Sequence, residues 1–322
     1  MNHATCTADI AAARSPSRGL SQGTKGGLLL VLAILVWGAN WPVMKSGLDH
    51  IGPLWFAASR FALGGLCLFV VQLGTGTLCL PSRRDLPLVV SVGLLQMLTF
   101  TVLGTYAMLQ VDAGRSAVLA YTTPLWVVPA ALIFFGERVS RLQVVGVLFG
   151  LCGVIALINP LSLDWGDETL LKANLMLLLA SLAWALCILH LRHSKGDSTA
   201  YQLAPWQMLL ATVPLLALAW VFEGPFNGDG SRSLWLIALF VGPLATAFCF
   251  CAVNAASMWL SSTSMSTAML GVPVVGLLMS AAFLGEALTA DLIIGVSAIV
   301  GGIALISWSG RKRTAKEDPP AA

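Results

Sequence analysis

Residues 114–158 read GRSAVLAYTTPLWVVPAALIFFGERVSRLQVVGVLFGLCGVIALI, two apolar runs joined by a Gly136-Glu137 turn. Pro124 removes a backbone donor and predicts a bend within the first run. Ser140, followed three residues later by Gln143, forms a capping-box pattern that predicts the start of the next helix. The stretch therefore predicts two helices joined by a short turn.

The same pattern occurs again 149 residues further along the chain. The matches fall mainly on glycine, proline and glutamate, which shape or end helices, so shared hydrophobicity alone does not explain them. They indicate an internal repeat. The matched pairs are Gly93 with Gly242, Pro124 with Pro273, Phe134 with Phe283, Gly136-Glu137 with Gly285-Glu286, Ser140 with Thr289, Gly146 with Gly295, and Gly153 with Gly302.

Two interpretations of Glu137 and Glu286 stay open at this point. The first is a solvated turn that only joins two helices, because the capping pattern next to it already accounts for a polar connection. The second is a role in gating or ion coupling, with Pro124 and Pro273 as the bends that let two helices move.

The composition indicates an integral membrane protein. Of 322 residues, 57% are hydrophobic and 10% are charged, and the mean hydropathy is +0.84. A bilayer core of about 30 Å needs roughly 20 apolar residues per helix. The charge-free runs predict ten transmembrane helices and an all-α fold. The expected spans are 26–44, 53–73, 86–110, 114–135, 140–158, 171–191, 201–222, 234–258, 261–284 and 289–308.

The repeat divides these spans into two halves of five. We expect a first repeat over 26–158 and a second over 171–308, joined by an external acidic loop over 159–170. Residues 1–25 predict a disordered cytoplasmic tail, and residues 309–322 a basic cytoplasmic tail. Because five is odd, the second repeat enters the membrane in the opposite sense.

The distribution of basic residues predicts the orientation. Of 18 lysines and arginines, one lies within a span, and with both termini inside, 13 are cytoplasmic and four are external. Positive charge accumulates on the cytoplasmic side of membrane proteins. We therefore expect a multi-pass protein of a bacterial-type inner (plasma) membrane with both termini in the cytoplasm. The four external residues are Lys45, Arg115, Lys172 and Arg232.

Polar residues inside the spans mark a candidate cavity. An amide facing lipid is costly, so Asn40 should face the interior of the bundle. Arg60 is the one charge well inside a span, and it either snorkels to the interface or faces a polar cavity. In the second repeat Gln207 stands in its place, so a role for Arg60 is not symmetric.

The motifs resemble those of EamA-type transporters of the drug/metabolite transporter superfamily. The resemblance rests on WGANWPVMK, PLWFAASR, and the run TTPLWVVPAALIFFGE with its counterpart GVPVVGLLMSAAFLGE, and it covers about residues 28–308. It implies two inverted five-helix repeats around a central cavity lined by helices one, three, four, six, eight and nine. The cavity candidates are then Trp37, Asn40, Trp41, Arg60, Gln96, Thr99, Tyr106, Tyr121, Thr122, Trp184 and Asn254.

The resemblance implies a secondary transporter, and export of amino acids or related small metabolites by alternating access is the expected function. Import of a vitamin, nucleobase or carboxylate-bearing metabolite is the alternative. Efflux of lipophilic cations is less favoured, because such a pump needs a carboxylate within the membrane and none of the 15 acidic residues lies mid-span. A zwitterionic or anionic substrate suits Arg60 better.

Other classes of function find less support. A membrane enzyme would need a cluster of His, Asp or Glu at one membrane face, and only His190 and His193 stand close together. A structural or lipid-handling protein would scatter the amides of Asn40, Gln96 and Asn254 instead of gathering them. We expect a small-molecule substrate and a lipid bilayer as partners, no nucleic acid, no cofactor and no metal, with monomer or homodimer left open.

Overall fold

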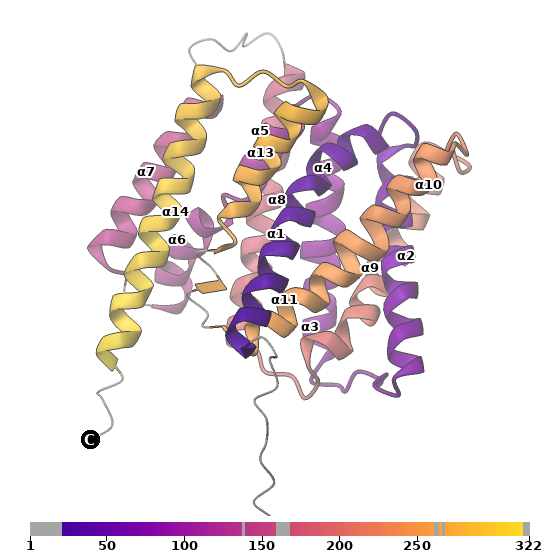
Figure 1. Ribbon diagram of the computed structural model, residues 1–322, viewed down its shortest axis with the longest axis horizontal. Coiled ribbons are helices and arrows are strands. Elements are labelled where there is room, and N and C mark those ends of the chain that lie inside the picture. The colour runs from indigo at the N-terminus through magenta and orange to yellow at the C-terminus, as the bar shows by residue number, and fades with distance from the viewer. Residues whose placement is uncertain (1–20, 137–138, 159–167, 261–263, 266–267, 318–322) are drawn as a thin grey trace, which may run out of the picture.

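The structure is a computed structural model that describes residues 21–136, 139–158, 168–260, 264–265 and 268–317. Within these ranges every regular element is a helix (Figure 1). The helices are α1 Gln22–Gly47, α2 Pro53–Gly74, α3 Leu86–Val90, the π-helix η1 Ser91–Thr99, α4 Phe100–Met108, α5 Ala113–Ala120, α6 Thr123–Phe135, α7 Arg141–Ile158, α8 Glu168–His193, α9 Ala200–Glu223, α10 Arg232–Leu239, the π-helix η2 Phe240–Phe248, α11 Cys249–Ser257, α13 Gly271–Leu284 and α14 Ala290–Glu317.

The described helices are long and apolar enough to cross a membrane many times. Eight helical stretches have the length and hydropathy of a membrane span, and two shorter apolar helices cover Arg141–Leu157 and Gly271–Leu284. This arrangement is compatible with the ten spans predicted from the sequence. The described beginning of the chain and the end of α14 lie at the same end of the bundle (Figure 1).

The third and eighth spans each contain a π-helix at the same position of the repeat. The segments Ser91–Thr99 and Phe240–Phe248 are nine residues long and 149 residues apart, which is the shift found in the sequence. In a π-helix the backbone bonds reach one residue further than in an α-helix, and the turn widens. The internal repeat is therefore a feature of the backbone as well as of the sequence.

Glycines at equivalent positions let both π-helices pack closely on a neighbour. A Cβ atom on Gly93 would lie 3.0 Å from the carbonyl oxygen of Gln207, and one on Gly242 would lie 3.1 Å from that of Arg60. Gln207 and Arg60 are themselves counterparts in the two repeats. The same close packing thus fixes η1 on α9 and η2 on α2.

The fifth and tenth spans, α7 and α14, cross each other at their glycines. A Cβ atom on Gly146 would lie 2.7 Å from the carbonyl oxygen of Gly302, and one on Gly153 would lie 2.8 Å from that of Gly295. Because the earlier glycine of α7 meets the later glycine of α14, the two helices run antiparallel. This is the geometry that inverted repeats require across their symmetry axis.

The fourth span is broken where the sequence predicts a bend. Helix α5 ends at Ala120 and α6 begins at Thr123, with a turn at Tyr121 and Thr122 between them. Pro124 lies in the first turn of α6, where its missing N–H costs least. The span is thus two short helices joined at a polar turn.

The turn after α6 has the features that the sequence predicts. Gly136 adopts the left-handed conformation (φ 61°) that suits a helix C-terminus, and Gly285 does the same (φ 69°) at the end of α13. The capping box is confirmed, because the Ser140 N–H donates to the Gln143 side chain at 2.8 Å and the Gln143 N–H to the Ser140 hydroxyl at 3.2 Å. Glu137 lies outside the described residues.

Two helices begin before the residues at which the sequence predicts them, and a third continues beyond its predicted membrane span. The helix α1 starts at Gln22, within the predicted tail 1–25, because the Ser21 hydroxyl accepts the Thr24 N–H and caps it. The helix α8 starts at Glu168, inside the predicted loop 159–170, with a Lys172–Glu168 pair along its first turn. The backbone of α14 continues to Glu317, while the part of it that is apolar enough to cross a membrane ends at Trp308, as the sequence predicts.

Asp85 joins the connection between α2 and α3 to the connection between α8 and α9. Its carboxylate is fully buried and accepts the N–H groups of Ser82, Asp197 and Ser198 and the Ser198 hydroxyl, at 2.8–3.1 Å. Burial alone would raise its pKa, but the hydrogen bonds from Ser198 and Ser82 outweigh it and hold the pKa well below that of a free aspartate. Asp85 is therefore an ionised link between the two repeats.

Substitution of Gly153 by alanine tests the α7–α14 crossing. The new Cβ would lie 2.8 Å from both the Gly295 carbonyl oxygen and the Ile299 nitrogen, so the backbones must separate. We expect Gly153→Ala to lower the stability by about 1–3 kcal/mol, measured as the thermal unfolding midpoint in detergent.

Gly27→Ala is the matched control, because it adds a methyl group to α1 where nothing lies within 4 Å. Both substitutions replace a helical glycine by alanine and gain about the same helix propensity, up to roughly 1 kcal/mol. The difference between their unfolding midpoints therefore reports the packing at Gly153. Equal midpoints for the two variants would contradict the crossing.

The second test is Asp85→Asn. Because the folded pKa is depressed, ionised Asp85 contributes its full stability above the unfolded pKa of about 3.9, and this contribution disappears as the pH falls through the folded pKa. We expect the variant to lose about 1–3 kcal/mol at pH 7, since one buried acceptor is removed. The difference in unfolding free energy between Asp85→Asn and the wild type should become smaller below about pH 4.

Asp197→Asn is its control, because the Asp197 side chain is half exposed and surface ion pairs contribute little. If the difference in unfolding free energy between Asp85→Asn and the wild type is the same at every pH, the charge of Asp85 does not stabilise the link.

Candidate functional site

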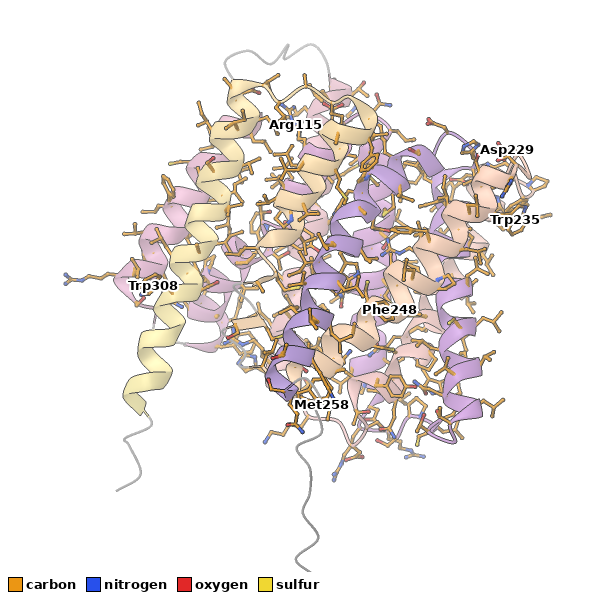
Figure 2. The ribbon with its side chains drawn as sticks, in the orientation of Figure 1. Arg115, Asp229, Trp235, Phe248, Met258 and Trp308 are labelled. Carbon is orange, nitrogen blue, oxygen red and sulfur yellow. The ribbon has the colours of Figure 1, made fainter. Side chains whose placement is uncertain are left out.

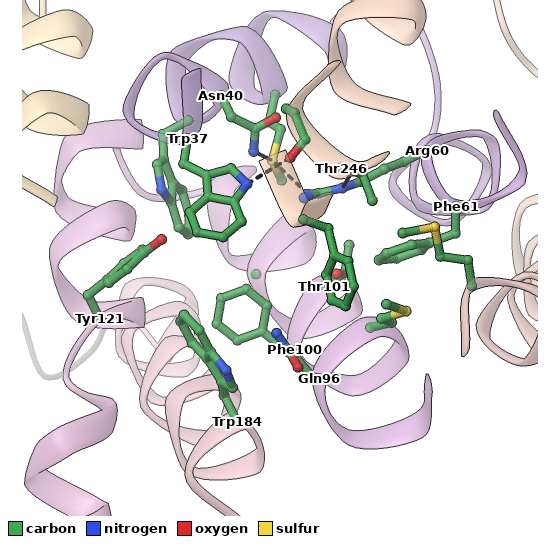
Figure 3. A pocket seen from close by; sticks show the side chains of 17 residues that line it. Trp37, Asn40, Arg60, Phe61, Gln96, Phe100, Thr101, Tyr121, Trp184 and Thr246 are labelled. Carbon is green, nitrogen blue, oxygen red and sulfur yellow. Dashed lines mark hydrogen bonds between the residues drawn. The ribbon is translucent and has the colours of Figure 1, made fainter. Parts of the chain in front are cut away.

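A central cavity is lined by side chains from both repeats (Figure 3). Its volume of about 120 Å³ far exceeds the roughly 10–15 Å³ that one water molecule needs on the same measure, so it suits a small solute. The lining residues are Trp37, Asn40, Trp41, Met44, Arg60, Phe61, Gln96, Met97, Phe100, Thr101, Gly104, Tyr121, Trp184, Met208, Ala245, Thr246 and Phe250.

The elements around the cavity differ in part from those that the family resemblance implies. The lining comes from α1, η1, α4, the turn between α5 and α6, α8, η2 and α11, and also from the second and seventh spans through Arg60, Phe61 and Met208. Within the described part of the ninth span, α13 contributes no lining residue. It packs instead against α1 and α5.

The structure brings most of the sequence candidates together around this cavity. They come from five separate spans, so only the fold places them side by side. The candidates that line the cavity are Trp37, Asn40, Trp41, Arg60, Gln96, Tyr121 and Trp184.

Two further candidates lie away from it, with their polar groups bonded to their own helices. The Thr99 hydroxyl donates to the carbonyl oxygen of Leu94 at 2.8 Å, and the Asn254 amide donates to that of Phe250 at 2.8 Å. Of the three amides expected to converge, the structure gathers Asn40 and Gln96 but not Asn254.

Thr122 and Tyr106 also lie away from the cavity and bond to other spans. The Thr122 hydroxyl is buried and lies 2.9 Å from the Ser181 hydroxyl of α8. The Tyr106 hydroxyl lies 3.4 Å from the Glu223 carboxylate, at the end of α9. Sequence position alone could not separate these residues from the lining, because the direction in which each side chain points depends on how its helix packs.

Arg60 lines the cavity and is held there by two contacts. Its Nε–H donates to the Thr246 hydroxyl at 2.8 Å, and Nη1 lies 3.3 Å from the Met44 sulfur. The guanidinium also lies 5.5 Å from the centre of the Phe61 ring. These neighbours keep the charged group beside the cavity.

The π-helix η2 prepares Thr246 for this contact. The Thr246 hydroxyl donates to the carbonyl oxygen of Val241, five residues earlier, at 2.7 Å. Since its one proton is committed there, the oxygen can only accept from the Arg60 Nε–H. Sequence reasoning missed Thr246, although a hydroxyl just after the Gly242-Pro243 pair was a usable signal.

Arg60 has no acidic partner in the described part of the chain. No Asp or Glu lines the cavity, and no described carboxylate lies within 4.0 Å of the guanidinium. Of its five N–H groups, only those at Nε and Nη1 have acceptors among the described residues. Because a charge shielded from water needs a partner, the cavity is suited to an anion.

Asn40 faces the same cavity from α1. Its Nδ2 group lies 2.8 Å from the Met44 sulfur, while Oδ1 is buried without a hydrogen-bond partner among the described residues. Sulfur is an acceptor, so the amide nitrogen must face it and the oxygen must face away. Figure 3 shows Asn40 on the same side of the cavity as Trp37 and Arg60.

Aromatic rings form the opposite wall (Figure 3). The Trp184 ring packs edge-on against Phe100 at 5.2 Å and against Tyr121 at 5.4 Å between ring centres. The Trp37 indole is fixed from the other side, because its N–H donates to the carbonyl oxygen of Ala245 at 2.7 Å. Such rings offer flat apolar surface with little freedom to move.

Most of the lining that the sequence did not reveal is apolar. These residues carry no polar signal, and apolar side chains in a membrane span face lipid, another helix or a cavity with equal ease. The lining residues that the sequence did not single out are Met44, Phe61, Met97, Phe100, Thr101, Gly104, Met208, Ala245, Thr246 and Phe250.

We call the end of the bundle where α1 ends the Lys45 face, and the opposite end, where α14 ends, the terminal face. An apolar plug separates the cavity from the Lys45 face. In it the lining residues Trp41 and Met44 pack with Met108, Ala113 and Ala117, all three of which are fully buried. The cavity is therefore closed on this side.

Charged side chains hold the α4–α5 connection over this plug. The Glu286 carboxylate accepts the N–H groups of Ala113 and Gly114 at 2.6 and 2.9 Å. The Lys45 ammonium donates to the carbonyl oxygens of Met108 and, at 3.2 Å, Val111. These groups satisfy backbone atoms at a helix end that have no partner within the helix.

Further contacts between the repeats lie at the Lys45 face. The Arg115 guanidinium lies 3.4 Å from the Asp291 carboxylate, and His50 lies 2.6 Å from Asp229. Arg115 and Asp229 are seen at this face in Figure 2, whereas Met258 lies at the terminal face. Within the described residues, no group of three His, Cys, Asp or Glu side chains could hold a metal ion.

Comparison with known proteins agrees with this architecture. The model of the EamA-like transporter family matches residues 24–159 and again 171–308. The chain is 26% identical to the uncharacterized transporter YoaV of Bacillus subtilis, over 88% of this chain and 97% of that protein. It is 27% identical to a probable amino-acid metabolite efflux pump of Salmonella typhimurium, over 91% of this chain and 98% of that protein.

A solved crystal structure shares the fold, with a TM-score of 0.60 at 22% identity over 90% of this chain and 99% of the other. The family match covers both repeats and most of the chain. This protein is a multi-pass membrane transporter that belongs to the EamA-like transporter family.

Proposed function

We propose that the protein exports amino acids or related small carboxylate-bearing metabolites across the inner membrane by alternating access. The observation that carries the proposal is Arg60, a positive charge beside a central cavity with no acidic partner in the described chain. A carboxylate would accept the free N–H groups in a charge-assisted bond. The similarity to a probable amino-acid metabolite efflux pump supports the same class of substrate.

The charge of the cavity also argues against organic cations. Transporters of lipophilic cations need a negative group at the site to offset the loss of hydration. Here the lining has one cation and no anion among the described residues. A cationic substrate would therefore meet electrostatic repulsion from Arg60.

Alternating access assigns a role to the closed plug. On the positive-inside rule the Lys45 face is external and both termini are cytoplasmic. The structure then corresponds to a state closed to the outside, and release of an exported substrate requires the contacts of Glu286 and Lys45 to break. Glu286 is the external gate residue in this proposal.

The prolines fit as hinges of the moving helices. Pro124 lies in the first turn of α6 after the turn at 121–122, and Pro273 lies in the first turn of α13 after a turn at 269–270. Helices broken at such points bend without losing further backbone bonds. We assign the movement of α5 relative to α6, and its counterpart in the second repeat, to these positions.

Arg60→Gln tests the anion site. Loss of a charge-assisted hydrogen bond of about 1.5–3 kcal/mol should lower kcat/KM roughly 10- to 100-fold. The measurement is counterflow of radiolabelled amino acids in proteoliposomes. Arg84→Gln is the control, because Arg84 is largely exposed in the α2–α3 connection and should keep wild-type transport.

Two outcomes would contradict the anion site. One is a wild-type protein that moves no carboxylate-bearing solute but accumulates an organic cation. The other is unchanged amino-acid transport in Arg60→Gln.

Glu286→Gln tests the external gate. The neutral amide keeps one acceptor oxygen for two N–H groups, which should weaken the closed state by about 1–3 kcal/mol. We expect the Ala117→Cys substitution in a cysteine-free background to react several-fold faster with an impermeant maleimide added from outside. Ala117 is a suitable probe because it is fully buried in the plug.

Glu168→Gln is the matched control, because Glu168 lies at the same face but is exposed and bonded only to Lys172 among described side chains. If the labelling rate of Ala117→Cys is the same in both backgrounds, Glu286 does not hold the gate.

A further inference from the structure

One side chain of the cavity, Thr246, holds the guanidinium of Arg60 in place. Thr246 is 7% exposed, lines the cavity and accepts the Arg60 Nε–H at 2.8 Å (Figure 3). Its own proton goes to the carbonyl oxygen of Val241, five residues earlier in the π-helix η2, at 2.7 Å. The direction of the hydroxyl is therefore set by η2, and its oxygen is kept as an acceptor for Nε.

The backbones of η2 and α2 are packed closely around this contact. A Cβ atom on Gly64 would lie 3.1 Å from the carbonyl oxygen of Gly242, and one on Gly242 would lie 3.1 Å from that of Arg60. Small residues at a helix contact let two backbones approach to this distance. The packing keeps Thr246 opposite the guanidinium.

The contact decides which edge of the guanidinium a ligand can reach. A carboxylate pairs with arginine through two parallel bonds, either at the edge made by Nε and one terminal nitrogen or at the edge made by Nη1 and Nη2. Thr246 covers the first edge. Of the two N–H groups on Nη1, one contacts the Met44 sulfur at 3.3 Å, and Nη2 has no acceptor among the described residues. The second edge is therefore the one left for a ligand.

We propose that Thr246 is a positioning residue of the carboxylate site, which holds Nε so that the substrate carboxylate binds end-on to Nη1 and Nη2 of Arg60. This inference rests on the proposed function and names the group that presents Arg60 to the substrate. A guanidinium that is already fixed loses little side-chain freedom when the substrate arrives, so binding is tighter. Without the hydroxyl, each substrate molecule would have to order Arg60 as it binds.

The equivalent positions of the two repeats differ at both members of this pair. Where η2 has Thr246, η1 has Met97, and where α2 has Arg60, α9 has Gln207. A thioether carries no hydroxyl that could be held by a π-helix and accept from a guanidinium. The threonine therefore stands opposite the arginine and is absent opposite the glutamine.

Thr246→Val tests the positioning role. Valine has nearly the shape of threonine and covers Nε with a methyl group, so the guanidinium loses its acceptor and no ligand can take the place of the hydroxyl. Counterflow in proteoliposomes is measured with the radiolabelled amino acid that the wild type transports fastest, starting from leucine and phenylalanine. We expect KM to rise roughly 3- to 10-fold, because binding must now order one long side chain, with kcat within about twofold of the wild type.

Thr246→Ser keeps the hydroxyl and should have the wild-type KM. Thr246→Ala also withdraws the hydroxyl, so the same rise in KM is expected, and it replaces Thr246→Val if that variant does not fold.

Thr99→Val is the matched control. The Thr99 hydroxyl makes the same bond in η1, to the carbonyl oxygen of Leu94 five residues earlier at 2.8 Å, but it lies away from the cavity. The substitution therefore perturbs a π-helix without removing a contact of Arg60. We expect this variant to keep the wild-type KM.

A double variant separates positioning from a purely structural role. If Thr246 acts through the guanidinium, Thr246→Val combined with Arg60→Gln should have the KM of Arg60→Gln alone, whereas independent effects multiply. The inference would be overturned by a wild-type KM in Thr246→Val, by an equal rise of KM in Thr99→Val, by a raised KM in Thr246→Ser, or by multiplied effects in the double variant.

Failure of the proposed function would look different. In that case the wild type would exchange no carboxylate-bearing solute, or Arg60→Gln would transport amino acids as the wild type does. A protein whose transport needs Arg60 but not the Thr246 hydroxyl would keep the proposed function and reject only the positioning role.

Discussion

A guanidinium that has no acidic partner in the described chain, at the centre of a membrane bundle, is the constraint on which the functional half of the structure depends. A charge in such surroundings must be hydrogen-bonded or solvated, since its desolvation is expensive. Thr246 and Met44 fix the orientation of Arg60 without neutralising it. The cavity therefore keeps a standing positive potential, and the chemistry of its ligand follows from that potential.

Charged side chains at the ends of the helices also bond to uncharged groups. Glu286, Glu223 and Asp85 each accept backbone N–H groups at or beside the start of a helix that belongs to another part of the chain. Ions in these positions do not pair with one another but with backbone groups that a helix terminus leaves free. Contacts of this kind can be exchanged for water when a helix end moves, which a tightly packed apolar interface cannot do.

Much of the fold could be predicted from the sequence. The length of the apolar runs predicted the membrane spans. The 149-residue shift predicted the repeat, because helix-shaping residues such as Gly136 and Gly285 are required by local backbone geometry. The π-helices could not be foreseen, since η1 and η2 carry no distinctive residue pattern. Their matching positions became visible only in the backbone.

The site was predictable only in part. Residues whose chemistry is conspicuous in lipid, such as Arg60, Asn40 and Trp184, could be selected, because a polar or large aromatic group there needs a reason. The rotation of each helix was not predictable, so Thr99 and Asn254 could not be told apart from true lining residues. Met44 illustrates the remaining gap, because its role as a shared acceptor depends on two neighbours from different spans.

The two π-helices also bear on the history of the chain. A widened turn of equal length at the same position in both halves is most simply inherited from one five-helix ancestor, present before that gene was duplicated and fused. Two separate copies of one such unit would carry the same residue at the two positions where Arg60 and Gln207 stand in this chain. Because both units belong to one chain, their residues can differ, and the positive charge of Arg60 can stand on one side of the cavity alone.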